Sequence, residues 1–175
     1  MECLSMMVGA GVFDDVYKRG NIMSEEEYFQ KARINLLKAE YRIAFAGYDK
    51  PFMEDPITIQ TIHTALNSSQ LMLQAIIPED SETYLEELAA DPLTSSLVTL
   101  MKTLKAPTQQ WGFILLDQNY VMYWDARKKT HFAPEQAQGV YYREISTNPK
   151  TVLKCAENFM ELERDSRRYL LRKKN

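Results

Sequence analysis

The stretch from Ile57 to Ile77 constrains the fold of this chain more than any other. It contains no Asp, Glu, Lys or Arg, although these residues make up 26% of the sequence, and Pro56 and Pro78 bound it. At 3.6 residues per turn its apolar side chains gather on one broad face. A surface helix normally carries charged residues toward solvent, so we expect this helix to have neighbours on more than one side. The stretch therefore predicts the central helix of a helical bundle, and it is too polar to cross a bilayer.

A narrow stripe of uncharged polar side chains runs beside that apolar face. Its members are Gln60, His63, Asn67, Gln70 and Gln74. Amide groups can pair with another helix or with exposed backbone at modest desolvation cost, because no charge has to be buried. Two interpretations stay open: the stripe binds a partner protein, or another part of the same chain covers it. We take these five residues as the candidate partner-binding surface.

Capping residues predict where the other helices begin. Ser24 and Glu27 form a capping box, which predicts a helix that continues to Gly47. A dipeptide that places an N-cap residue before proline occurs three times, as Asp55-Pro56, Asp91-Pro92 and Asn148-Pro149. We therefore expect further helices after each of these dipeptides, and a shorter helix from Ser81 to Ala90.

The hydrophobic periodicity changes after Gln110 and predicts a small sheet. Phe113 to Leu116 is a continuous apolar run, Tyr120 to Trp124 is rich in aromatic residues, and Val140 to Ile145 suits a third strand. The expected fold class is α+β, with an N-terminal helical bundle, a three-stranded antiparallel sheet and a closing C-terminal helix. The predicted bounds are 24–106 for the helices, 110–146 for the sheet and 149–172 for the last helix. Residues 23–175 would form a single domain, with 1–22 as a peripheral or poorly ordered segment.

Composition narrows the function classes. The formal net charge of −3 argues against nucleic acid as a partner. Two cysteines, Cys3 and Cys155, suggest neither a disulfide framework nor a zinc site, and two histidines argue against a protein-only metal centre. We expect no cofactor and no metal. No convincing secretory signal precedes the fold, so we expect a cytoplasmic protein that does not contact a membrane; a homo-oligomer is compatible with the sequence.

Nucleic-acid binding has one pattern in its favour. Tyrosine and tryptophan side chains of the predicted sheet could stack on bases, and Arg143 together with the basic segment 127–129 would supply charge. Alternation along a strand, however, sends these aromatic residues to opposite faces, with one set in the core.

Asp125, His131 and Glu144 are the best acid–base set in the sequence. A short loop between Asp125 and His131 could bring the two side chains together at the end of a hairpin. Asp at a strand end and His after a basic loop are also ordinary surface residues. No motif of a known catalytic class fixes their geometry.

One segment resembles a known family. The strand region Trp111 to Asp125, with Gly112-Phe113-Ile114 and Tyr123-Trp124-Asp125, is similar to the strand region of the SUKH family of immunity proteins. The resemblance covers a small part of the chain, and the glycine-rich N-terminal turn of that family is missing. It implies a protein-binding function.

Two functions follow from these observations. The first, which we favour from the sequence, is a non-enzymatic protein-binding factor: an adaptor, a dedicated chaperone, or an immunity or inhibitor protein. The alternative is a small enzyme with an acid–base site around Asp125, His131 and Glu144.

Overall fold

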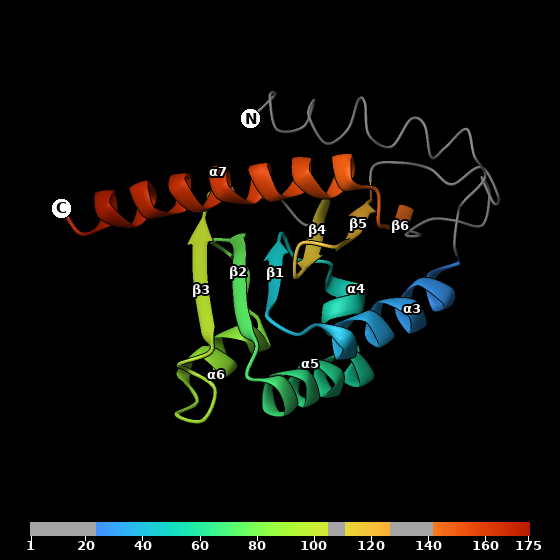
Figure 1. Ribbon diagram of the computed structural model, residues 1–175. Helices are drawn as coiled ribbons and strands as arrows, with labels where there is room; N and C mark the ends of the chain where they lie inside the picture. The colour runs from blue at the N-terminus through green and yellow to red at the C-terminus, as the bar shows by residue number, and fades with distance from the viewer. Residues whose placement is uncertain (1–23, 105–110, 127–141) are drawn as a thin grey trace.

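The computed structural model describes residues 24–104, 111–126 and 142–175, and in these residues a six-stranded mixed sheet forms the centre (Figure 1). The strands lie in the order β3-β2-β1-β4-β5-β6. Their bounds are β1 Arg42–Ala46, β2 Met72–Pro78, β3 Val98–Thr103, β4 Trp111–Leu116, β5 Tyr120–Asp125 and β6 Tyr142–Ser146. β1, β2 and β3 are parallel, whereas β4, β5 and β6 form an antiparallel meander that joins the sheet through β1.

Helices cover both faces of the sheet, which gives a three-layer α/β/α arrangement (Figure 1). The long helix α7 lies across one face. The other face carries four shorter helices. The bounds are α3 Glu25–Lys38, α4 Lys50–Met53, α5 Pro56–Ser69, α6 Tyr84–Ala90 and α7 Pro149–Lys173. Among the described residues no helix is long and apolar enough to cross a membrane.

Alternation along each strand divides the core between the two faces. In β1, Ile43 and Phe45 pack toward α3, α5 and α6, whereas Ala44 and Ala46 belong to the cluster beneath α7. Every residue of β4 is buried, as expected of a strand with helices on both sides. Gly112 in β4 admits no side chain, because a Cβ there would lie 2.3 Å from the Ala46 carbonyl oxygen and 2.8 Å from the Trp124 indole nitrogen.

The predicted fold class is wrong: the N-terminal part is not a helical bundle. The stretch Ile57 to Ile77 forms helix α5 up to Ser69 and then strand β2 from Met72. Gln70 between them has a left-handed backbone with φ of 51°, which ends the helix. A parallel strand buried on both faces is a continuous apolar run, so the second half of this stretch matched a helical face equally well.

The same ambiguity produced two other errors. The helix predicted to run to Gly47 ends at Lys38, and the apolar residues after it form β1. The helix predicted after Asp91-Pro92 is absent, because residues 92–97 form turns and β3 begins at Val98. Asp91 follows the end of α6, and its carboxylate accepts a hydrogen bond from the Leu93 N–H in a tight turn.

The predicted helix starts at Ser24, Asp55 and Asn148 are confirmed, unlike the one at Asp91, and so are the short aromatic strands. Ser24, Asp55 and Asn148 accept hydrogen bonds from backbone N–H groups at the starts of α3, α5 and α7. The predicted meander is present as β4, β5 and β6, although it is half of a larger sheet. The last helix extends from Pro149 to Lys173, one residue beyond the predicted bound. The segment 1–22 lies outside the described residues.

Candidate functional site

The structure brings two of the three predicted acid–base residues onto neighbouring strands. In the antiparallel pairing of β5 with β6, Asp125 lies opposite Tyr142 and Tyr123 lies opposite Glu144. All four side chains therefore project from the same face of the sheet, toward α7. We call this set the carboxylate–tyrosine cluster. The third predicted residue, His131, lies outside the described residues.

Hydrogen bonds within each strand order the carboxylate–tyrosine cluster. The Tyr123 hydroxyl donates to Asp125 Oδ2 at 3.3 Å, and the Tyr142 hydroxyl donates to Glu144 Oε2 at 3.1 Å. The two tyrosine rings meet edge to face with centroids 6.4 Å apart. Asp125 is 0% and Glu144 5% exposed. The arrangement can hold or pass a proton between carboxylate and phenol, but its burial keeps a substrate from contacting the two acids directly.

A buried ionic cluster lies on the opposite face of β6, and sequence reasoning missed it. Arg143 donates to both carboxylate oxygens of Asp49, at 2.9 and 3.1 Å, and to Glu25 at 2.7 Å. Its guanidinium also stacks over the rings of Tyr28 and Phe29. Burial opposes the charge, but the Asp49 carboxylate raises the pKa of Arg143 above its usual value.

Arg143 is therefore not the surface cation that the sequence suggested. It is 1% exposed, so no ligand can reach it in this structure. The only signal in the sequence is the alternation of β6, which places Arg143 on the face opposite Tyr142 and Glu144. Alternation gives no indication that Asp49, 94 residues away, provides the partner.

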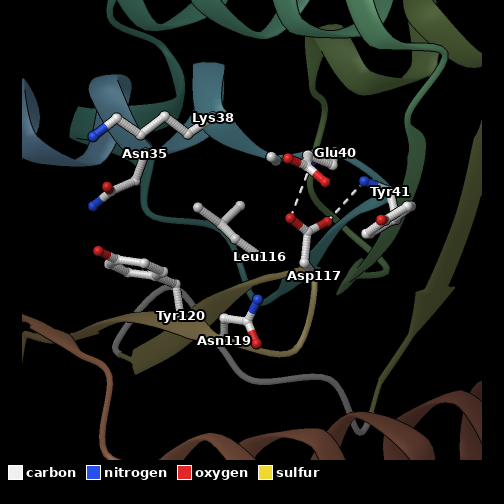
Figure 2. A pocket seen from close by; sticks show the side chains of 9 residues that line it. Asn35, Lys38, Glu40, Tyr41, Leu116, Asp117, Asn119 and Tyr120 are labelled. Atoms are coloured by element: carbon white, nitrogen blue, oxygen red, sulfur yellow. Dashed lines mark hydrogen bonds between the residues drawn. The ribbon is translucent and has the colours of Figure 1, made fainter.

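A shallow pocket of about 200 Å³ lies beside the β4–β5 turn (Figure 2). Asp117 projects from this turn, with φ of 56°, toward the segment between α3 and β1. Its carboxylate accepts hydrogen bonds from the backbone N–H groups of Glu40 at 3.0 Å, Tyr41 at 2.8 Å and Arg42 at 2.9 Å. These bonds fix the start of β1 against the meander. The carboxylate is thereby used for structure, and the pocket is smaller than the usual small-molecule site.

The C-terminal end of α7 is strongly basic. The last ten residues of the chain contain five cationic side chains and no acidic one. We call the following set the basic helix end: Arg164, Arg167, Arg168, Arg172, Lys173 and Lys174. All six are exposed. Arg164, Arg168 and Arg172 recur every four residues and so lie on one side of the helix.

Some members of the basic helix end have ionic partners and others do not. Arg167 pairs with Glu163 at 2.6 Å, and Lys173 pairs with Glu79. In the part of the chain that the structure describes, Arg164 and Arg172 have no ion-pair partner. Their charge is therefore available to an anionic ligand, and the negative end of the helix dipole favours cations at this terminus.

The five residues of the amide stripe do not form one surface. Gln60, His63 and Asn67 lie on α5, Gln70 ends that helix, and Gln74 lies in β2. Gln74 shares a strand face with Ile76, which packs beneath α7, whereas α5 covers the other face. The structure therefore separates Gln74 from the residues of α5.

No protein-family model and no curated protein matches the chain. Solved structures do match. NucT from Helicobacter pylori has 16% identity and a TM-score of 0.58, with 80% of this chain and 89% of that chain covered. Nuc from Salmonella typhimurium, a phospholipase D family member, has 13% identity and a TM-score of 0.52, with 78% and 86% covered.

A third match is TrmBL2, described as an archaeal chromatin protein with a novel mode of DNA binding. It has 14% identity and a TM-score of 0.53, and the match covers 77% of this chain. The chain spans about half of TrmBL2, 47% of its length. These proteins share the fold of this chain. At such low identity the likeness concerns the fold alone.

The comparisons correct the function expected from the sequence. One of the structures that share this fold, Nuc from Salmonella typhimurium, is described as a phospholipase D family member. This likeness contradicts the expectation of a non-enzymatic adaptor, chaperone, or immunity or inhibitor protein, and with it the leaning toward a non-enzyme. The likeness is one of fold and by itself assigns no activity to this chain. The resemblance of Trp111 to Asp125 to the SUKH family has no support from a family model.

Proposed function

We propose that this chain is a nuclease-like domain that engages the phosphodiester backbone of nucleic acid. The observation that carries the proposal is the shared fold. Of the structures described above, Nuc is a phospholipase D family member and TrmBL2 is described by its mode of DNA binding. The fold resembles that of phospholipase D family nucleases. Each match covers more than three quarters of this chain, so the likeness extends over both halves of the sheet.

The basic helix end supports nucleic acid as the ligand. Lys and Arg side chains that contact phosphates supply most of non-specific nucleic-acid affinity, through the release of counterions. The net charge of −3 describes the whole chain, whereas the cations concentrate at one end of α7. Tyr169 and Leu170 lie among these cations, so apolar and aromatic contacts accompany the charge.

A binding measurement tests this proposal. Labelled single- and double-stranded oligonucleotides are titrated with the protein at several salt concentrations, and fluorescence anisotropy gives the Kd. We expect the affinity to fall as the salt concentration rises. The slope of log K against log salt concentration should be about −0.9 for each phosphate contact on duplex DNA and about −0.7 on a single strand. The variant Arg164→Gln/Arg168→Gln/Arg172→Gln should lose most of this slope.

The matched control changes the same amount of charge elsewhere. Lys31, Lys38 and Lys50 are exposed and lie on α3 and α4, on the other side of the sheet. The variant Lys31→Gln/Lys38→Gln/Lys50→Gln should bind as the parent does. Equal losses in the two triple variants, or no salt-dependent binding at all, would contradict the proposal.

Hydrolysis of the bound phosphodiester is a second candidate, which the carboxylate–tyrosine cluster favours. Because Asp125 and Glu144 are buried, they would not touch the substrate. They would exchange or position protons of groups that do, while the water oxygen bonds to phosphorus and the P–O bond to the leaving oxygen breaks. Incubation of a labelled oligonucleotide, with and without magnesium, tests this step. Cleavage that is lost in Asp125→Asn and in Glu144→Gln, with binding retained, supports hydrolysis. Cleavage unchanged in both variants excludes these two residues.

A further inference from the structure

An acidic pocket of about 460 Å³ lies outside the carboxyl ends of the parallel strands β1 and β2. Ligands of open α/β sheets bind preferentially at this edge. The segments that line the pocket come from just after β1, from the end of α4, and from the starts of α5 and α6. The lining residues are Tyr48, Glu54, Ile59, Glu82, Thr83, Tyr84, Glu86 and Glu87.

The charge of the lining is negative throughout. Glu86 pairs with Lys102 at 2.5 Å, which offsets one of the four carboxylates. Glu54, Glu82 and Glu87 have no ion-pair partner among the described residues, and no Lys or Arg lines the pocket. Three like charges around one cavity repel each other, so a cation bound there would be stabilised.

Three buried hydroxyl groups in the same lining also have no hydrogen-bond partner. These are Tyr48 Oη, Thr83 Oγ1 and Tyr84 Oη, which are three of the seven such side-chain atoms in the described residues. Tyr48 is only 2% exposed. A buried polar atom without a partner costs about 1–3 kcal/mol, so their concentration at one cavity indicates a ligand that would satisfy them.

The surroundings of the two tyrosine hydroxyl groups raise their pKa values. Burial raises the pKa of Tyr48 above its usual range, and the nearby Glu54 carboxylate raises it further. Burial and the neighbouring Tyr48 raise the pKa of Tyr84 in the same direction. Both phenols therefore stay protonated and neutral, and their oxygens can accept hydrogen bonds.

We propose that this pocket binds an organic ammonium ion, such as a linear polyamine. An ammonium group has three N–H donors and no acceptor, which matches hydroxyl oxygens beside carboxylates. The two tyrosine rings add faces that attract a cation. The volume suits a small organic molecule. The pocket repels phosphates, so this site is separate from the proposed engagement of nucleic acid and does not depend on it.

A metal ion is the competing cation, and the geometry favours it less. In the described part of the chain no group of three or more His, Cys, Asp or Glu side chains is placed to hold a metal ion. The glutamates surround the cavity without converging on one point. Divalent cations prefer convergent oxygen ligands, whereas an extended polyamine can reach separated carboxylates.

Isothermal titration calorimetry with spermidine, in buffer with physiological salt, tests the proposal. The variant Glu54→Gln/Glu87→Gln should weaken binding by about tenfold or more, which corresponds to at least about 1.4 kcal/mol. Tyr84→Phe should weaken it about fivefold and should melt no lower than the parent, because it removes an unpaired buried hydroxyl. The melt shows that the lost affinity does not come from unfolding.

The control variant Glu157→Gln/Glu161→Gln removes two exposed carboxylates of α7. It should bind spermidine within about twofold of the parent. Equal weakening in the control and in Glu54→Gln/Glu87→Gln would show diffuse attraction to an acidic protein and would overturn the proposal. Tighter binding of magnesium than of spermidine, abolished by Glu54→Gln/Glu87→Gln, would overturn it in favour of a metal site.

Discussion

Arg143 and Asp49, 94 residues apart in sequence, form a bidentate ion pair in which both side chains are 1% exposed. This pair connects the last strand of the sheet to the N-cap of α4, where Asp49 also accepts from the Phe52 N–H. Glu25 at the start of α3 completes the contact. One guanidinium thus joins three elements that the sheet ladder does not connect.

We expect Arg143→Met to destabilise the protein by about 3–5 kcal/mol, because it leaves the Asp49 carboxylate buried without a partner. The double variant Arg143→Met/Asp49→Leu should recover part of this loss, since no charge then remains inside. Urea denaturation of the parent, the two single variants and the double variant gives the coupling energy. Additive losses would show that the pair does not act as a unit.

Asp117 offers a second test, in which two substitutions separate its hydrogen bonds. Tyr41 and Arg42 both donate to Oδ1, whereas Glu40 donates to Oδ2. Asp117→Asn keeps an acceptor at Oδ1 and tolerates the left-handed backbone, so we expect a loss of about 1 kcal/mol. Asp117→Ala leaves all three N–H groups without their acceptor and should cost about 2–4 kcal/mol. Thermal melts of the two variants check the order; an alanine variant as stable as the asparagine variant would contradict it.

Asp55 should make stability depend on pH in the acid range. Burial alone would raise the pKa of Asp55, but the Thr58 N–H and the Arg33 guanidinium, 2.6 Å away, hold it below its usual value. A depressed pKa means that the folded state binds the proton less readily than the unfolded state. The contribution of Asp55 is therefore fully present above about pH 4 and is lost as the pH falls through the folded-state pKa.

The variant Asp55→Asn isolates this contribution, because an amide oxygen still caps α5 while the ion pair with Arg33 is removed. Urea denaturation between about pH 3 and pH 7 should show a smaller acid-dependent loss than in the parent. Parallel curves for the two proteins would show that Asp55 is not linked to acid unfolding.

Cys155 should be unreactive in the folded protein. It lies on the face of α7 that packs against the sheet, in the cluster that contains Phe159 and Val152, and this burial raises its pKa to about 12. Because the thiolate is the reactive form, a thiol reagent at neutral pH should not modify it. The variant Cys3→Ser leaves Cys155 as the one cysteine. We expect no reaction with the reagent until denaturant unfolds the chain, and rapid native-state labelling would contradict the packing of α7.

The sequence by itself determined the features that depend on local chemistry. The caps at Ser24, Asp55 and Asn148 follow from side chains that bond N–H groups two or three residues ahead, so no distant partner is needed. The meander of β4 and β5 follows from a short turn between two strands with strong β propensity. The sequence also predicts Asp125 and Glu144 as acid–base candidates from their side chains, and the pairing of β5 with β6 places both on one face of the sheet.

Only the tertiary structure decided that three apolar runs form parallel strands. Runs such as Leu73 to Ile77 are buried on both faces, so they lack the alternation that distinguishes a strand from a buried helix. Their strand state depends on pairing with β1 and β3, where Met72 pairs with Arg42 and Leu73 with Val98, 30 and 25 positions away in the sequence. The same long-range pairing creates the Arg143–Asp49 contact and gathers Tyr48, Glu54 and Tyr84 around one pocket. Such contacts arise from the packing of distant segments, which local sequence patterns do not encode.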